Sequence, residues 1–457
     1  MQNMKQDMMR LWKNVFGDSD GYIDLFFKNY YNEKLFDTVY SDDKLVSQLC
    51  CVPYVFKFLN NCDKHSYHKS TNSKLENIIK AGYLCGLATL PEYRNKGIMS
   101  SLIHKSNRDM RREGFAVSFL IPASKELRIY YDKFGYIDIS NYWNTILDRN
   151  VFNNKEITID YSRNNILYNI TFGDTDKYVV VSINDCIRDI ELRNLSPYSS
   201  NDVKELYDYF CKTVSHIEGC VLVHSYLDFI TILRENYLNR GYVLCIKDED
   251  NKPSGMLFCS NIREGEATVQ LLIADSEDSA VVLLNTLKSM LPENVDLIVR
   301  EYDGAVPRLF EQPSAACYAN ENSMTKEDEE SSMTSGSLVR CRLPLAMARI
   351  LNVSEILKFV AASYPRSEFS ILIKSDEFPE NEGFYTVRDS KVLFSPLECM
   401  STHQLMEVER LCSHEHGYFQ LTVPELSSIL WRDFKEPLDG GLDLIPRLPL
   451  NVFLMLE

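Results

Sequence analysis

The sequence has no apolar run long enough to cross a lipid bilayer. Its longest apolar runs, such as LVSQLCCVPYVFKFL, are interrupted by polar residues, whereas a spanning helix needs about 20 mostly apolar residues. The first residues, MQNMKQDMMRLWKN, lack the apolar core and the cleavage site of a signal peptide. The 13 cysteines show no paired spacing, which fits reduced thiols better than a disulfide framework. We therefore expect a cytoplasmic protein without a membrane span.

Positive charge is also scarce. The chain carries 49 lysines and arginines against 65 aspartates and glutamates, which gives a net charge of −16. An acidic protein repels nucleic acid backbones, so DNA and RNA are not expected as partners. The same field attracts cationic small molecules, including amines, although solubility alone accounts for such a charge.

Patterns typical of metal sites and of serine nucleophiles are missing too. His414 and His416 lie two positions apart with no third cluster of ligands, which favours a solvated turn over a metal site. No serine lies in a nucleophile-elbow context. We therefore expect no metal cofactor.

The composition and the order of segments indicate several domains. With 457 residues, 45% of them hydrophobic, the chain is long enough for about three globular domains. Residues 1–150 and 151–310 each alternate strand-like and helix-like segments. Residues 311–336 are polar and acidic, which is typical of a linker, although an ordered loop would also fit. Residues 337–457 begin with a helix near Val353–Ala361, continue with hairpin strands and end in the apolar LPLNVFLMLE, which indicates a buried terminus.

The most informative segment runs from residue 83 to residue 136. The pattern predicts a strand over Tyr83–Thr89, a turn that contains Pro91, and then a helix that Gly97 opens. A second strand follows, and a second helix is predicted over residues 125–133.

A strand, a tight turn and a glycine at a helix N-terminus together form an anion site. The first-turn N–H groups have no partners inside the helix, and the helix dipole favours negative charge there. Gly97 has no Cβ, so a phosphate can approach the backbone closely, and Arg94 and Lys96 add positive charge. Taken alone, Arg-x-x-Gly is weak, because an ordinary strand–turn–helix connection with a solvated Arg94 and Lys96 shows the same pattern.

Two motifs in this segment resemble the GNAT superfamily of acetyltransferases. The phosphate loop of that family, Arg/Gln-x-x-Gly-x-Gly/Ala after Pro-x-Tyr, is matched by PEYRNKGIM from Pro91 to Met99, with Met99 in place of the small residue. The later family motif, Tyr-x-x-x-Gly-Phe/Tyr, is matched by YDKFGY from Tyr131 to Tyr136. The two motifs occur in the family's order with a strand between them.

The whole chain resembles the Eis-like (enhanced intracellular survival) acetyltransferases within that superfamily. The resemblance implies an α+β (mixed α/β) fold, with tandem GNAT folds followed by a sterol-carrier-protein-like α/β domain. It implies a catalytic domain at 1–150, a degenerate second GNAT-like domain at 151–310, the acidic linker at 311–336 and the C-terminal domain at 337–457. Because the family often forms oligomers, a homo-oligomer is expected.

The second domain allows an independent check of this resemblance. The segment Ala274–Asp278, ADSED, stands where a phosphate loop would follow the predicted strand Val269–Ile273. Its three carboxylates would repel a pyrophosphate. We therefore expect that the second domain does not bind coenzyme A.

By the same resemblance, acetyl-CoA is the co-substrate and Tyr131 is the general acid for the leaving thiolate. A phenol with a pKa of about 10 stays protonated at rest and suits this role, although a core aromatic in an amphipathic helix is the alternative for Tyr131. The spacing to Gly135 and Tyr136 selects Tyr131 over the adjacent Tyr130. The terminal carboxylate, which belongs to Glu457, would accept the proton of the amine, with burial or a water relay compensating for its weak basicity.

The resemblance also implies which groups contact the cofactor. Backbone groups of the first strand would pair with the pantetheine arm. The amides of the loop and first helical turn would hold the pyrophosphate, and the serine just before the second helix would lie nearby. The cofactor residues expected in this way are Leu87, Ala88, Thr89, Arg94, Asn95, Lys96, Gly97, Ile98, Met99, Ser100 and Ser124.

The acceptor is an amine-bearing molecule in the leading hypothesis, a cationic small molecule that is aminoglycoside-like by family analogy. A protein lysine or N-terminal amine is a second enzymatic alternative. A third is a non-catalytic acyl-CoA or lipid-binding protein that uses the C-terminal domain as a lipid carrier. Tyr131 and a terminus within reach favour catalysis.

Overall fold

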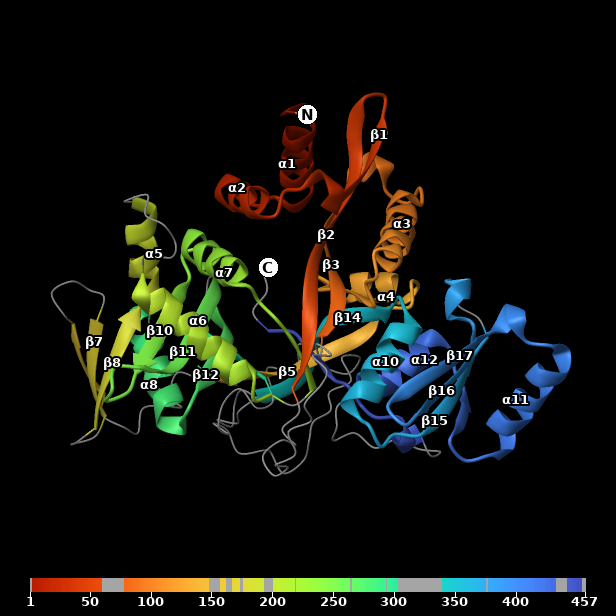
Figure 1. The fold of residues 1–457 in the computed structure, drawn as a ribbon. Coiled ribbons are helices and arrows are strands. Elements are labelled where there is room, and N and C mark those ends of the chain that lie inside the picture. The colour runs from red at the N-terminus through yellow and green to blue at the C-terminus, as the bar shows by residue number, and fades with distance from the viewer. Residues whose placement is uncertain are drawn as a thin grey trace. The chain divides into compact units, whose positions relative to one another are not determined.

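The computed structural model describes most of the chain and divides it into two compact units (Figure 1). The described residues are 2–59, 78–147, 157–161, 167–172, 176–192, 200–217, 219–263, 265–292, 294–302, 339–374, 377–432 and 442–453. The first unit comprises residues 1–140, 218–223 and 344–452, and the second comprises residues 141–217, 224–343 and 453–457. No helix among the described residues is both long enough and apolar enough to span a bilayer.

The first unit is built around a mixed sheet. Its strands follow the order β19-β9-β2-β3-β4-β14, and β1 pairs with β2. Their bounds are β1 Phe36–Ser41, β2 Lys44–Leu59, β3 Ile78–Thr89, β4 Val117–Leu120, β9 Gly219–Leu222, β14 Val339–Ile350 and β19 Leu450–Asn451. The helices that accompany this sheet are α1 Gln2–Phe16, α2 Asp20–Asn29, α3 Ile98–Arg112 and α4 Lys125–Asp132. Figure 1 shows α1 and α3 on opposite sides of β2 and β3.

Helix α3 illustrates how the sequence produces these elements. Its buried residues recur at intervals of three and four, which is the helical period; they are Leu102, Ile103, Ser106, Asn107 and Met110. Glycines with positive φ flank the helix, Gly97 at +76° and Gly114 at +83°, a conformation that costs glycine little. The prediction that Gly97 opens this helix is confirmed, because Gly97 is its N-cap.

The remainder of the first unit is a smaller sheet with its own helices. The strand order is β17-β16-β15-β18. The elements are α10 Val353–Ser363, β15 Phe369–Ile373, β16 Gly383–Arg388, β17 Lys391–Pro396, α11 Thr402–His414, β18 Tyr418–Gln420 and α12 Val423–Leu430. Asp389 and Ser390 both have positive φ, as a two-residue hairpin turn between β16 and β17 requires. The capping box that the sequence indicates at Thr422 and Glu425 is present.

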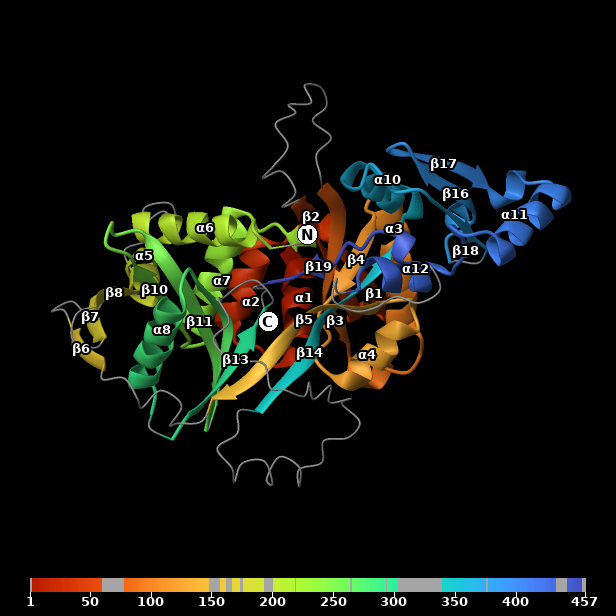
Figure 2. The same ribbon diagram turned by 90° about the horizontal axis from the view of Figure 1, so that it is seen from below.

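The second unit also mixes strands and helices. Its strand order is β5-β13-β12-β11-β10-β8-β7-β6. The strands are β5 Ile137–Leu147, β6 Ile157–Tyr161, β7 Leu167–Phe172, β8 Asp176–Ser182, β10 Tyr242–Lys247, β11 Pro253–Arg263, β12 Glu266–Ala274 and β13 Asp296–Glu301. The helices are α5 Ile183–Leu192, α6 Asn201–Val214, α7 Tyr226–Leu238 and α8 Glu277–Met290. Helices α5, α6 and α7 contact one another, while α8 packs against β10, β11 and β12 (Figure 2).

The expected mixed α/β class is confirmed in both units. The acidic segment 311–336 and the terminal Glu457 lie outside the described residues.

Candidate active site

Strands β3 and β4 run side by side and then separate. They pair in parallel at Ala81 with Val117, Gly82 with Ser118 and Tyr83 with Phe119. Strand β4 ends at Leu120, whereas β3 continues to Thr89. In the described part of the chain, no strand pairs with the β4-side edge of β3 beyond Tyr83. This edge contains the backbone of Leu87, Ala88 and Thr89, and an extended ligand can add to an unpaired strand edge.

The other edge of β3 carries a bulge in the same region. Its pairing with β2 shifts register between Gln48 and Cys50, and Gly86 has a φ of +59°. A Cβ on Gly86 would lie 2.3 Å from the Trp12 ring, so α1 packs directly on this point. Bulges often redirect backbone groups beside active sites.

The loop that follows β3 leaves backbone donors exposed at the start of α3. Asn95 and Gly97 both have positive φ, and the first helical hydrogen bond runs from Ser101 N to Gly97 O at 3.0 Å. The N–H groups of the residues between Gly97 and Ser101 donate to no backbone group in the described ranges. A Cβ built on Gly97 meets no atom within 4 Å. The corner is therefore open to an anion that needs main-chain donors.

The side chains of the loop leave this corner clear. Arg94 donates from Nε to Thr89 O at 3.1 Å, and Lys96 Nζ lies 4.8 Å from the centre of the Tyr93 ring. Both cations stay exposed beside the loop. Met99, the bulky residue of the motif, packs against the hydrophobic core. These features fit the pyrophosphate of a coenzyme, which would contact the first-turn amides.

Tyr131 lies in the hydrophobic core between α3, β4 and β14. Its side chain is 7% exposed, and its ring contacts those of Tyr130 and Tyr136 at centroid distances of 5.4 and 6.3 Å. Burial, followed by the neighbouring Tyr130 and Tyr136, raises the pKa of Tyr131 well above its usual value. A raised pKa keeps the phenol protonated, as a general acid requires.

The adjacent Tyr130 has a different environment. Its hydroxyl lies 3.2 Å from Ser100 Oγ, so it joins α4 to the first turn of α3. The choice of Tyr131 over Tyr130 as the acid stays a prediction, and the structure gives Tyr130 a hydroxyl partner at the start of α3.

Other expected site residues have the following positions. Ser124 is the N-cap of α4, where its hydroxyl accepts a hydrogen bond from Leu127 N at 3.3 Å. Glu457 falls outside the described residues, so its expected role as base stays a prediction. In the second unit, Ser276 caps α8, Glu277 and Asp278 occupy its first turn, and Tyr209 donates to Asp275 at 2.9 Å. Carboxylates thus lie where the loop at Gly97 has open amides.

Two residues near the site were missed by sequence reasoning. Arg349 of β14 is 5% exposed and donates to Phe134 O at 2.7 Å. The available signal was a single arginine inside the apolar run LAMARIL, because a buried charge needs a partner. Gln48 of β2 is fully buried, and neither atom of its amide has a partner in the described part of the chain.

The comparisons with known proteins agree with this geometry. Residues 65–137 match the family model described as "Acetyltransferase (GNAT) domain". This segment is similar to the GNAT acetyltransferase domain. A search of curated proteins gave no match.

Solved structures with the same fold extend the likeness to nearly the whole chain. A GCN5-related N-acetyltransferase from Anabaena variabilis has 13% identity and a TM-score of 0.61, covering 98% of this chain and 97% of its own. One from Kribbella flavida has 14% identity and a TM-score of 0.53, covering 94% and 86%. Eis1 from Mycobacterium abscessus has 10% identity and a TM-score of 0.55, covering 99% and 97%. At these identities, the likeness concerns the fold.

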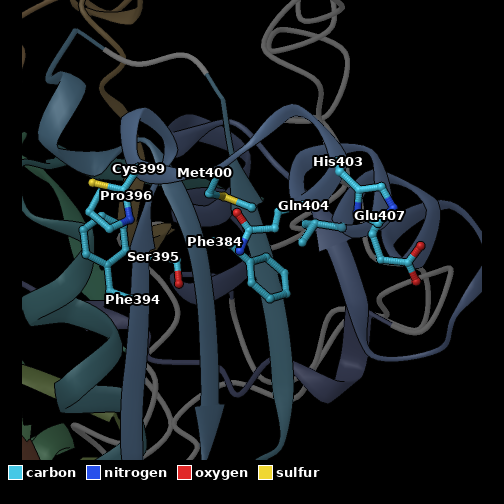
Figure 3. A pocket seen from close by; sticks show the side chains of 10 residues that line it. Phe384, Phe394, Ser395, Pro396, Cys399, Met400, His403, Gln404 and Glu407 are labelled. Carbon is cyan, nitrogen blue, oxygen red and sulfur yellow. The ribbon is translucent and has the colours of Figure 1, made fainter.

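A pocket of about 470 Å³ lies elsewhere, in the C-terminal part of the first unit (Figure 3). Phe384 and Met400 form part of its apolar lining, while His403 and Glu407 of α11 face it with polar groups. No residue expected to bind the cofactor or to carry catalysis lines it. Among the described residues, no cluster of three or more histidines, cysteines, aspartates or glutamates is arranged to hold a metal ion.

Proposed function

We propose that this protein is an acetyl-CoA-dependent N-acetyltransferase of the Eis-like type, acting on an amine-bearing, cationic small molecule. The observation that carries the proposal is the open corner at Gly97, where a Cβ would meet no atom within 4 Å. This corner lies at the end of the β3 edge that β4 leaves unpaired. With its diphosphate bound to the first-turn amides of α3 and its pantetheine arm along β3, the coenzyme would place its thioester where β3 and β4 separate.

Bound acetyl-CoA supplies an activated acetyl group as a thioester. Leu87 and Thr89 hold the pantetheine arm through their backbone, and the amides from Gly97 to Ser100 hold the diphosphate. Tyr131 donates its phenolic proton to the departing sulfur as the amine forms the amide bond. The terminal carboxylate of Glu457 takes the proton that the amine loses. The site is reset when the terminal carboxyl of Glu457 releases its proton to solvent and the Tyr131 phenolate takes one from solvent.

The net charge of the chain supports an amine as the acceptor. The net charge of −16 attracts cations to the molecule. The same charge favours a small cation over a nucleic acid.

In this proposal the second unit is a GNAT-like domain that does not bind coenzyme A, because carboxylates occupy the start of α8. The C-terminal part is sterol-carrier-like, and the assembly is a homo-oligomer in the cytoplasm.

Two measurements test the proposal. Isothermal titration with CoA should show binding, and a panel of small amines with acetyl-CoA should release free thiol with at least one of them. Absence of CoA binding contradicts the proposal outright. Adding residues after Glu457 should lower turnover while CoA binding is retained, whereas full turnover in the extended protein would exclude the terminal carboxylate as base.

A further inference from the structure

Arg349 is a charged side chain inside the core of the first unit. Strand β14 pairs antiparallel with β4, with Arg349 opposite Ser118 and Ala348 opposite Phe119. The strand neighbours of Arg349, Ala348 and Ile350, are fully buried. A guanidinium cannot lose its proton, so its burial is tolerated only where its donors and its charge are matched.

The partners of Arg349 come from two other parts of the unit. Its Nη1 donates to Phe134 O at 2.7 Å and to Glu377 Oε2 at 2.5 Å. Its guanidinium also lies 4.9 Å from the centre of the Phe378 ring. The second oxygen of Glu377 is hydrogen-bonded to His104 Nδ1 on α3. The carboxylate of Glu377 therefore links Arg349 to the helix that starts at the phosphate loop.

Phe134 belongs to the turn that ends the helix of Tyr131. The N–H groups of Phe134 and Tyr136 both point at Tyr131 O, at 2.9 and 3.4 Å. Gly135 between them has a φ of +75°, and a Cβ there would lie 3.7 Å from Arg349 Nε. The carbonyl that Arg349 binds is therefore part of the turn that holds the backbone of Tyr131.

Helix α4 is short and contributes little to the core. It has eight residues, and Tyr131 is its one buried residue; helices of this length are marginal without tertiary contacts. A second contact joins α4 to β14 in the reverse direction, because Arg128 of α4 donates to Pro344 O at 2.6 Å. Arg349 of β14 thus donates to a carbonyl in the turn after α4, and Arg128 of α4 donates to a carbonyl of β14.

We propose that Arg349, held by Glu377 and His104, is the positioning residue that sets Tyr131 for proton donation, so that the acetyl-transfer site is completed by the C-terminal part of the chain. The inference rests on the proposed function. Arg349 acts through the Phe134 carbonyl and does not itself contact the reacting atoms. A phenol displaced by about 1 Å from the sulfur loses most of its effect, since misplacements of this size cost about 100-fold in rate.

The test is a double-mutant cycle between Arg349→Met and Tyr131→Phe on the full chain, with acetyl-CoA and an amine that the wild-type protein acetylates. We expect Arg349→Met to lower kcat by about 10- to 100-fold and to leave the Kd for CoA within about threefold. In the Tyr131→Phe background, the same change should lower kcat by less than about twofold, because residues that act as a unit are not additive. Guanidinium ion added to Arg349→Ala, which leaves room for it, should restore part of kcat, but only where Tyr131 is present.

Arg388→Met is the matched control. Arg388 also lies in the C-terminal part, but its side chain is 66% exposed and pairs with Glu368 at 3.5 Å and Asp389 at 3.7 Å. It should retain wild-type kcat. If Arg349→Met also retains it, or loses the same factor with and without Tyr131, the positioning role is refuted.

A second variant and a second readout cover a failure to fold. If Arg349→Met is not folded by circular dichroism, Glu377→Gln takes its place in the same cycle under the same criteria. Amide hydrogen exchange in residues 125–136 should rise in the folded variant relative to Arg388→Met, and unchanged exchange refutes the inference without any turnover. If the wild-type protein binds CoA but acetylates no amine, the proposed function is contradicted. If the enzyme is active but the effects of the two substitutions on kcat are additive, only the positioning role of Arg349 is contradicted.

Discussion

The hydroxyl of Tyr136 donates to Asn107 Oδ1 at 3.0 Å inside the core. The same hydroxyl lies 2.6 Å from Ser118 Oγ, so it joins the end of the motif YDKFGY to α3 and β4. Tyr136 is fully buried. These two hydrogen bonds, which a phenylalanine could not make, explain why a tyrosine stands at position 136.

Tyr136→Phe should destabilise the protein by about 1–3 kcal/mol, because Asn107 and Ser118 would each lose a buried partner. The free energy of unfolding from urea denaturation measures this effect, and Tyr93→Phe in the half-buried loop serves as the control. Burial raises the pKa of Tyr136 to about 12, so the folded state holds this proton more tightly than the unfolded chain does. The stabilising contribution is complete below about pH 10 and is lost as the pH rises towards 12. An unchanged midpoint in Tyr136→Phe would contradict this account.

Gly97→Ala should weaken CoA binding about tenfold or more, because a Cβ would occupy the position from which a diphosphate approaches the backbone. Gly114→Ala is a matched control on the same helix. Both glycines have a φ near +80° and open space at the Cβ position, so both substitutions carry the same backbone strain of about 1 kcal/mol. Titration of each variant with CoA separates the effects. Equal losses of affinity in the two variants would show that strain, not contact with the anion, is responsible.

The local elements of the site were predictable, whereas their long-range partners were not. Hydrophobic spacing and the two flanking glycines locate α3, and the turn at Pro91 locates the end of β3, because these signals act over a few residues. The contact between Arg349 and Phe134 spans 215 positions, and no local pattern reports such a distance. The insertion of β14 beside β4 likewise depends on packing that a single sequence does not display. The sequence spacing favours Tyr131 over Tyr130 as the acid, which stays a prediction, whereas the contact of Tyr130 with Ser100 is visible only in three dimensions.

Tyr131→Phe should lower kcat by about 100-fold or more, which is the usual effect of removing a general acid, while the Kd for CoA stays unchanged. The raised pKa of Tyr131 predicts the pH profile of the wild-type enzyme. A general acid is active in its protonated form, which lies below its pKa. Its own deprotonation should therefore cause no fall in kcat below about pH 10. Steady-state kinetics across this range provide the measurement, and an alkaline fall at lower pH that disappears in Tyr131→Phe would contradict the assignment.

Tyr130→Phe should act on coenzyme binding more than on turnover. The Tyr130 hydroxyl contacts Ser100 in the first turn of α3, so its loss frees the loop that would hold the diphosphate. We expect the KM for acetyl-CoA to rise about two- to tenfold, in line with a hydrogen bond worth about 0.5–1.5 kcal/mol, and kcat to change little. Ser100→Ala should give the same rise, and the double variant should be no worse than either single one. A fall in kcat without a change in KM for Tyr130→Phe would indicate that Tyr130, not Tyr131, is the proton donor.

Gln48→Met should increase stability. The amide of Gln48 is fully buried without a partner in the described part of the chain, and an unpaired buried amide costs about 1–3 kcal/mol. Methionine has nearly the same shape without that cost, so we expect the free energy of unfolding to rise by about 1 kcal/mol. Asn236→Leu is the contrasting control, because Asn236 is also buried but donates to Cys259 O at 2.9 Å, and its loss should destabilise. A lower stability of Gln48→Met would contradict this account and show that the amide has a stabilising partner. A rise in the KM for the amine in the same variant would indicate that the amide contacts the acceptor.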